Sequence, residues 1–350
     1  MTIFRPQSLK EACAILRAAA ADEKSERREI RLIAGGTDLI PRLNQEFESC
    51  GGLCLLSAYP EMTGVRRETD GRLFVGAMTT LTALTKEPLL KRWRALTEAA
   101  SRAATPQIRN QGTIGGNLLQ ENRCMYYNNQ VPWSQVNRCF KCGGTQCFQY
   151  PKSRQCMALF QSDLAPALIA FGAKAQIAGL LSDGDSAGEI LTMREIPVED
   201  LYLPADRKNL QPGQIVTGIL LPPLNGMTGS AYARWTIRQA FDFPLLSCAA
   251  AASFDGDPAE GWETARVSSC RIVFGSAGVK PRRFEAGEKA FEGLSGAALF
   301  EAAKGLRKEA GRLIMPFRDT RVDGEARREK AGDLLKEVIE NLTVTVRKER

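Results

Sequence analysis

Short blocks of hydrophobic residues, separated by polar and glycine-rich stretches, predict small helices and strands along the first half of the chain. Ser8 and Glu11 form a capping-box pattern at the start of an Ala-rich helix expected over residues 9–21. Leucine and alanine recur with helical spacing over 81–104, and Pro88 is expected to break that helix. Short apolar runs predict strands at 30–34, 53–57 and 72–77.

The second half has a different order of elements. After a helix start at residues 163–166, alternating strands continue to Leu221, and the Pro- and Gly-rich stretch 222–229 has the composition of a linker. Beyond it, strand-like runs at 230–238, 244–254 and 265–276 precede helical runs at 284–293, 297–313 and 324–341. We therefore expect an α+β chain with one domain over residues 1–222 and a second over 230–350.

The composition is ordinary for a globular protein. Of the 350 residues, 44% are hydrophobic and 25% are charged, which suffices for two or three domains with cores of their own. The formal net charge is +7, but Lys and Arg are scattered and the short basic runs lie beside acidic residues. This distribution favours a solvated surface, or contact with an acidic protein partner, over a nucleic-acid groove.

The chain contains no histidine, which excludes the commonest general acid–base residue and every Ser-His or Cys-His nucleophilic device. Any chemistry must therefore come from a cofactor or from carboxylates. No apolar run approaches the ~18–20 residues of a membrane span, and the amino-terminal sequence lacks the basic-then-apolar order of a signal peptide. We expect a cytoplasmic protein without membrane contact, in which thiols stay reduced.

Five of the ten cysteines fall in one polar stretch: Cys124, Cys139, Cys142, Cys147 and Cys156. That stretch lacks the apolar periodicity of core elements, so a metal ion or an iron–sulfur centre would hold its thiolates together. From the residues alone, Cys139 and Cys142 form a C-x-x-C ligand pair. The alternatives are a structural zinc, a disulfide-stapled loop, which a reducing compartment disfavours, and unrelated buried thiols.

Two double-glycine segments follow extended stretches of the sequence, Gly35-Gly36-Thr37-Asp38 and Gly115-Gly116-Asn117. Glycines at such turns let the backbone approach an anion closely, so that successive N–H groups can point at phosphate oxygens. Neither segment matches the Rossmann or Walker glycine patterns. Two such loops from distant parts of a sequence suit a dinucleotide, although each double glycine alone can be a simple tight turn.

Taken in order, these motifs resemble the FAD-binding subunit of the molybdenum hydroxylases, which include xanthine and carbon monoxide dehydrogenases. The matching segments are 32–39, 113–117, 162–166, 238–245 and 317–328. The resemblance implies an FAD-binding fold of the PCMH/vanillyl-alcohol-oxidase type with two subdomains, about 1–57 and 58–222. A carboxy-terminal α+β domain like that of the carbon monoxide dehydrogenase flavoprotein would follow.

The resemblance also implies which residues bind FAD. The backbones of 33–39 and 113–117 would cradle the pyrophosphate, and Asp163 would lie near the ribityl–flavin region. Arg234 stands where many relatives carry a lysine close to the flavin ring. The implied cofactor-binding residues are Leu32, Ile33, Ala34, Gly35, Gly36, Thr37, Asp38, Leu39, Ala104, Thr113, Gly115, Gly116, Asn117, Asp163 and Arg234.

The cysteine stretch lies in an insertion at about 118–161 that is similar to one in the flavoprotein subunit of 4-hydroxybenzoyl-CoA reductases. In that subfamily the loop carries a [4Fe–4S] cluster. The similarity implies Cys124, Cys139, Cys147 and Cys156 as ligands and leaves Cys142 spare. This assignment conflicts with the C-x-x-C pairing, and we follow it because the match is longer.

An electron-transfer subunit of an oxidoreductase is the function that the resemblance implies. The substrate site would lie on a molybdopterin-binding large subunit, and a [2Fe–2S] small subunit would complete a doubled heterotrimer. Electrons from a ferredoxin-like donor would pass through the [4Fe–4S] cluster and FAD towards molybdenum, for reductive dehydroxylation of an aryl-CoA. One alternative is an FAD subunit of a xanthine- or aldehyde-type dehydrogenase that passes electrons to NAD. Another is a non-catalytic interaction module with a zinc-stapled loop.

Overall fold

The computed structural model describes residues 1–21, 29–128, 138–182, 189–224, 226–238, 241–256, 264–296, 298–317 and 321–348. Residues 129–137 of the predicted insertion lie outside these ranges. So do residues 239–240 and 318–320, which belong to two of the matching segments. No helix in the described ranges is both long and apolar enough to cross a bilayer.

The chain begins with a small parallel sheet. Its strands, in spatial order, are β1 (Thr2–Phe4), β3 (Gly52–Leu55) and β2 (Ile30–Ile33), accompanied by helices α1 (Leu9–Ala21) and α2 (Leu39–Asn44). The Ser8 half of the capping box is confirmed, since the Glu11 N–H donates to Ser8 Oγ over 3.2 Å, whereas the Glu11 carboxylate accepts from the Gln7 N–H over 2.7 Å. Strand β1 and helix α2 were not predicted because both are too short to show periodicity.

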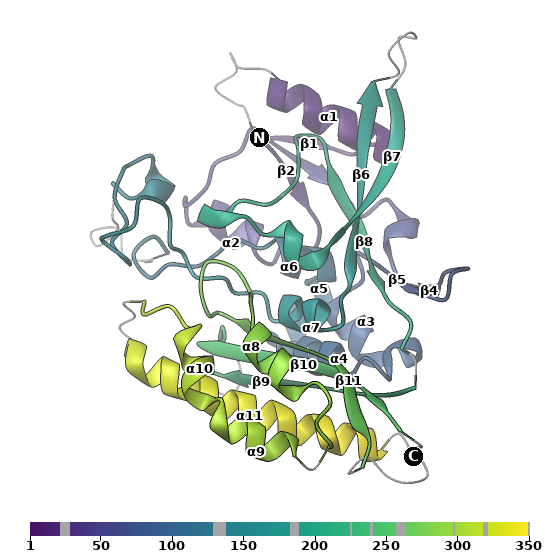
Figure 1. Cartoon of the computed structure of the whole chain (residues 1–350). Helices are drawn as coiled ribbons and strands as arrows, with labels where there is room; N and C mark the ends of the chain where they lie inside the picture. The colour runs from purple at the N-terminus through teal and green to yellow at the C-terminus, as the bar shows by residue number, and fades with distance from the viewer. Residues whose placement is uncertain are drawn as a thin grey trace.

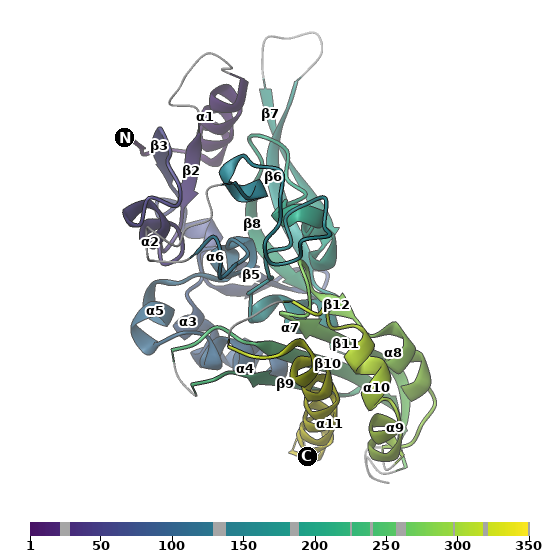
Figure 2. The same cartoon turned by 90° about the vertical axis from the view of Figure 1, so that its left-hand side faces the viewer.

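A five-stranded antiparallel sheet stands beside the first one (Figure 2). Its order is β4 (Val65–Arg67), β5 (Leu73–Gly76), β8 (Ile215–Leu221), β6 (Lys174–Ser182) and β7 (Glu189–Pro197). The helices of this region are α3 (Leu81–Lys86), α4 (Arg94–Arg102), α5 (Pro106–Gln111), α6 (Ile114–Leu119) and α7 (Leu164–Ala170). The expected helix over 81–104 does break at Pro88, where a 3₁₀ turn separates α3 from α4.

The carboxy-terminal part is an antiparallel sheet with helices along it (Figure 1). The sheet order is β12 (Arg282–Arg283), β11 (Arg266–Gly275), β10 (Leu246–Asp255) and β9 (Met227–Trp235). The helices are α8 (Glu285–Phe291), α9 (Leu299–Gly305), α10 (Arg307–Arg312) and α11 (Gly324–Lys348). Two expectations were wrong in detail. Strand β9 begins inside the stretch predicted as a linker, and the helix predicted over 297–313 divides into α9 and α10.

Strand β10 shows how the parts of the chain pack together. Its alternate residues Ala249 and Ala251 belong to the hydrophobic core of the amino-terminal region, whereas Ala250 and Ala252 belong to the core under α11. Helices α4 and α7 contact one side of this sheet, and α11 packs on β9 and β10. The strand is rich in alanine because elements cover both of its faces. The domain boundary near residues 222–229 stays a prediction.

Candidate functional site

A cleft of about 780 Å³ lies where the three-stranded sheet, the five-stranded sheet and helix α6 meet. This volume is within the range of small-molecule and cofactor sites, about 300–1,000 Å³. Every residue predicted to bind the cofactor lines the cleft except Arg234. The structure therefore brings together segments that are more than one hundred residues apart in the sequence.

Gly35 explains how two of these segments meet. A Cβ atom built on Gly35 would lie 1.8 Å from the carbonyl oxygen of Gln111, a separation that no side chain can occupy. The next residue, Gly36, has a φ of 70°, in the left-handed region that glycine tolerates. The backbone after β2 therefore lies directly against the end of α5, and together they form one wall of the cleft.

The backbone amides of residues 35–39 form the strongest feature of this wall. Within the described part of the chain, none of their N–H groups donates to a protein acceptor. The turn is held by other bonds, including that from the Ile40 N–H to the Gly36 carbonyl over 2.9 Å. Successive unpaired N–H groups at a glycine turn are an arrangement that binds anions such as a diphosphate.

The second glycine segment is built differently from the prediction. Thr113 caps helix α6 by accepting the Gly116 N–H over 3.1 Å, so Gly115 and Gly116 lie in the first turn of a helix. The Ile114 and Gly115 N–H groups donate to the carbonyls of residues 79 and 77, each over 2.9 Å. The expectation that several amides here are free for a ligand is therefore wrong. Residues of this segment line the cleft, and Asn117 offers a side chain to a ligand there.

Asn117 connects this helix to the third matching segment. Its Oδ1 accepts from Ser162 Oγ over 2.7 Å and from the Leu164 N–H over 3.3 Å. Because both donors hold the oxygen, the Nδ2 group is the part of the amide that remains for a ligand in the cleft. Sequence order alone could not predict this orientation, since it depends on the start of helix α7.

Asp163 is a buried carboxylate at the edge of the cleft. Tyr232 donates its hydroxyl to Asp163 Oδ1 over 2.6 Å, and Arg234 Nη1 lies 3.4 Å from the same oxygen. Burial raises the pKa of Asp163 above its ordinary value, whereas Arg234 and Tyr232 oppose the shift. The aspartate is therefore fixed in place by two partners from strand β9.

Arg234 does not itself line the cleft. Besides the ion pair with Asp163, it donates to the carbonyls of Arg102 and Asp242. Ala104, which does line the cleft, has a φ of 47°, and Arg109 supports this strained backbone by donating to its carbonyl over 2.9 Å. Arg234 thus contacts two residues that line the cleft, Asp163 and Asp242.

Residues of the carboxy-terminal part also reach the cleft, and the sequence prediction assigned them no role. Phe241 and Phe243 line it, with 57% and 41% of their surfaces exposed, and Arg238 stacks on Phe241. Arg123, from the start of the cysteine stretch, lines it too. The sequence did mark this region, since Arg238–Leu245 was one of the segments that match the family. The match did not indicate which of its side chains face the cleft.

The cysteine stretch brings its thiols into one neighbourhood. Burial raises the pKa of Cys124, and the charges of Cys147 and Cys139 raise it further. Burial raises the pKa of Cys156 to about 11, with a small contribution from Cys124. Cys124 is thus within electrostatic reach of the other three predicted ligands. Cys142 is exposed, and its Sγ lies 3.7 Å from that of Cys139.

Backbone amides oppose part of these shifts. Those of Tyr126 and Tyr127 lower the pKa of Cys124, and that of Ala158 lowers the pKa of Cys156. In the described residues, no three Cys, Asp or Glu side chains are placed to hold a single metal ion.

Comparison with known proteins identifies the family to which the chain belongs. A family model described as the FAD binding domain in molybdopterin dehydrogenase matches residues 1–224. The chain is similar to the FAD-binding subunit of an aldehyde oxidoreductase from Escherichia coli (strain K12), with 27% identity over 74% of this chain and 78% of the relative. It is also similar to the medium chain of carbon monoxide dehydrogenase from Hydrogenophaga pseudoflava, with 37% identity over 32% of this chain and 37% of that relative.

A solved structure shares the fold along the whole chain. Carbon monoxide dehydrogenase from Hydrogenophaga pseudoflava, lacking the Mo-pyranopterin moiety of its cofactor, contains a chain that matches with a TM-score of 0.74 and 24% identity. The match covers 99% of this chain and 98% of that one. The expected α+β architecture, an FAD-binding fold followed by a flavoprotein-like carboxy-terminal part, is confirmed.

Proposed function

Because the chain belongs to the family of FAD-binding domains in molybdopterin dehydrogenases, we propose that it carries FAD and a [4Fe–4S] cluster as the electron-transfer subunit of a 4-hydroxybenzoyl-CoA reductase-like complex. The reaction of the complex would be the reductive dehydroxylation of an aryl-CoA on a partner subunit. The observation that carries the proposal is the contact between cleft and cysteine stretch. Arg123, the neighbour of Cys124, lines the cleft and pairs with Asp38.

The residues of the cleft fit FAD. The free N–H groups of residues 35–39 suit the two phosphates, and Gly116 lines the same cleft. The Asn117 amide and the Asp163 carboxylate offer hydrogen bonds to the ribityl chain and the flavin. Bound FAD supplies a group that exchanges electrons with other redox centres, and the chain contributes binding and orientation.

We assign the cluster to Cys124, Cys139, Cys147 and Cys156. The charges of Cys147 and Cys139 raise the pKa of Cys124, and the charge of Cys124 raises the pKa of Cys156, which supports the proposal that these four thiols share one region. Cys142 lies at the surface beside Cys139, which is consistent with a spare thiol. A second redox centre beside the cleft would give electrons from a ferredoxin-like donor a way into the subunit.

The partners follow from the family. The relatives are named as an FAD-binding subunit and a medium chain, which are parts of larger assemblies. We propose a molybdopterin-binding large subunit and a [2Fe–2S] small subunit, in a doubled heterotrimer. Substrate chemistry would take place on the large subunit, which accords with the absence of histidine in this chain.

Anaerobic reduction of the purified complex distinguishes the direction of electron flow. Reduced ferredoxin should bleach the flavin absorbance within seconds, whereas NADH should leave it unchanged over the same time. Rapid bleaching by NADH, with none by ferredoxin, would favour an aldehyde- or xanthine-type dehydrogenase. Similarity to an aldehyde oxidoreductase subunit makes that outcome the second candidate.

Cysteine variants test the ligand assignment. We expect Cys147→Ser to lose most of the iron and acid-labile sulfide while FAD content stays constant, because Cys147 does not line the cleft. The matched control is Cys142→Ser, which removes a thiol from the same stretch and should retain the wild-type iron content. Unchanged iron in Cys147→Ser, or lost iron in Cys142→Ser, contradicts the assignment of these two residues.

A further inference from the structure

Lys141 lies in the middle of the Cys139–Cys142 segment, and its ammonium group is buried between two carboxylates. The side chain is only 10% exposed, with Nζ 2.7 Å from Glu121 Oε1 and 2.8 Å from Asp206 Oδ2. It also donates to the carbonyl of Asn122 over 3.2 Å. A lysine is rarely buried to this degree unless its partners compensate for the lost hydration.

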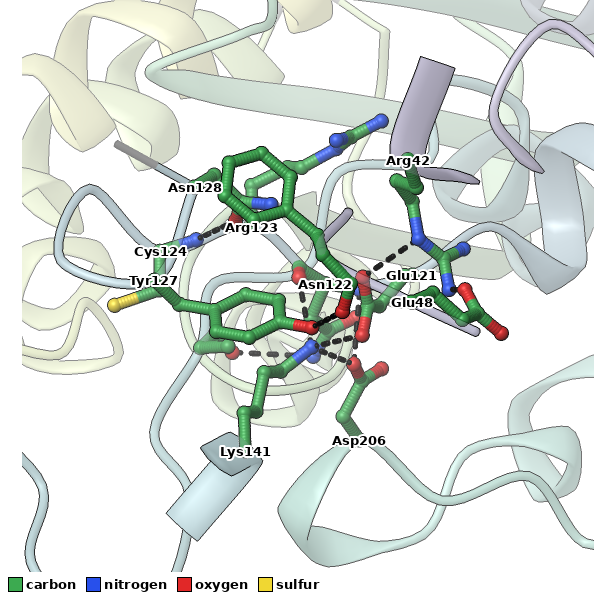
Figure 3. A network of polar contacts seen from close by, with 12 residues as sticks. Arg42, Glu48, Glu121, Asn122, Arg123, Cys124, Tyr127, Asn128, Lys141 and Asp206 are labelled. Carbon is green, nitrogen blue, oxygen red and sulfur yellow. Dashed lines mark hydrogen bonds and ion pairs between the residues drawn. The ribbon is translucent and has the colours of Figure 1, made fainter. Parts of the chain in front are cut away.

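The carboxylates around Lys141 belong to a network of polar contacts that includes Arg42 and Glu48 (Figure 3). Glu121, which binds Lys141 through Oε1, binds Arg42 Nε through Oε2 over 3.0 Å. Arg42 Nη1 in turn lies 2.9 Å from Asp38 Oδ2, and Arg42 also pairs with Glu48. Arg42, Asp38 and Glu48 all line the cleft. A continuous set of ion pairs therefore joins the cysteine stretch to the proposed FAD site.

A second connection runs along the backbone beside the first. The Glu121 N–H donates to Asp38 Oδ2 over 3.3 Å, and the Asn122 N–H donates to Asp206 Oδ2 over 3.0 Å. The Asn122 side chain donates to the carbonyl of Val279, in the carboxy-terminal part, over 2.8 Å. The start of the cysteine stretch is thus held by Asp38, Asp206 and Val279, and Asp206 is also a partner of Lys141.

The apolar contacts of the cysteine stretch are made with the carboxy-terminal part of the chain. Cys147, Met157 and Leu159 form a small buried cluster with Phe317 of the carboxy-terminal part. This cluster holds the far end of the stretch, whereas charged contacts with Glu121 and Asp206 hold the Cys139–Cys142 segment. Lys141 provides the two ion pairs of that segment.

We propose that Lys141 is a positioning residue that couples the cleft to the cysteine stretch, so that a ligand in the cleft orders the Cys139–Cys142 segment. The proposal rests on the assignment of FAD to the cleft. FAD held against residues 35–39 would restrain Asp38 and Arg42, and through Glu121 it would restrain Lys141. Such coupling is reciprocal. The factor by which FAD favours the ordered Cys139–Cys142 segment is also the factor by which the ordered segment raises the affinity of the cleft for FAD.

Hydrogen exchange of the full chain, with and without FAD, tests the coupling. The reporters are the Phe140 and Gly144 amides, which donate to the carbonyls of Gln146 and Cys139. Adding FAD to the wild type should slow their exchange by about 10-fold, and Lys141→Met should remove this response. Lys152→Met, at an exposed lysine of the same stretch, should behave like the wild type.

Lys141→Arg separates positioning from general destabilisation, because arginine keeps the charge and should restore most of the FAD response. Amides of β10 report on global folding and should exchange equally in all variants. An FAD response that persists in Lys141→Met overturns the coupling, even if the protein carries FAD and iron. A wild type that binds FAD and shows no response also overturns it. Failure of the wild type to bind FAD overturns the proposed function instead.

Discussion

Replacing Gly35 with alanine is expected to abolish FAD binding. The new methyl group would lie 1.8 Å from the Gln111 carbonyl oxygen, so the backbone after β2 and the end of α5 must move apart. The free amides of residues 35–39 would then lose their common orientation, and the phosphates would lose their donors. We expect the FAD content of the purified variant to fall at least about 10-fold, measured from flavin absorbance after denaturation.

Gly305→Ala is the matched control. Gly305 ends helix α9, and a Cβ atom there meets nothing within 4 Å. Alanine is the better helix former by about 1 kcal/mol, so this variant should keep its FAD and unfold no more easily than the wild type. Wild-type FAD content in Gly35→Ala contradicts the role assigned to the first glycine segment.

The second large effect is expected from Arg234→Met, which leaves Asp163 buried without its counter-charge. Removing one partner of a buried ion pair costs about 3–5 kcal/mol of unfolding free energy, because the remaining charge is uncompensated. Loss of the bonds to the carbonyls of Arg102 and Asp242 adds to this cost. Urea unfolding at neutral pH, followed by tryptophan fluorescence, measures the difference from the wild type.

The pH dependence of that difference identifies Asp163 as its cause. Burial raises the pKa of Asp163 in the folded state above its ordinary value of 3.8, so the folded protein binds this proton more tightly than the unfolded chain. The contribution of Asp163 to stability therefore decreases as pH rises from about 3.8 through the folded-state pKa. Arg234→Met removes the positive charge beside Asp163 and so raises that pKa further. The loss of unfolding free energy caused by Arg234→Met should therefore be largest at neutral pH and decrease on acidification.

Two further variants complete this test. Arg234→Met combined with Asp163→Asn should recover much of the lost stability at neutral pH, because a neutral amide needs no counter-charge. Tyr232→Phe removes only the 2.6 Å hydrogen bond and should cost about 1–3 kcal/mol. A cost of Arg234→Met that is the same at all pH values contradicts the electrostatic explanation.

The sequence predicted much of the fold and most of the cleft. The strand before Gly35 and the order of the matching segments indicated where a dinucleotide would bind, because glycine patterns at strand ends are local signals. Local glycine patterns could not predict whether the N–H groups of Ile114 and Gly115 are free for a ligand. Their partners are carbonyls of residues 79 and 77, and only the folded chain brings them together.

Charged residues were the least predictable part of the site. Lys141 and Glu121 look like ordinary surface residues in the sequence, and their burial depends on Asp206 from a distant segment. Arg234, predicted to lie near the flavin ring, does not line the cleft and pairs with Asp163, which does. Ion pairs between distant segments leave no periodic pattern, so a single sequence cannot indicate them.

Cofactor analysis of the anaerobically purified chain tests the central claim most directly. The measurement is flavin, iron, zinc and acid-labile sulfide per chain. We predict one FAD together with about four irons and about four sulfides, as expected for a [4Fe–4S] cluster beside the cleft. FAD without metal would leave the family assignment intact and contradict the cluster, and a chain that holds zinc and no FAD would contradict the account as a whole.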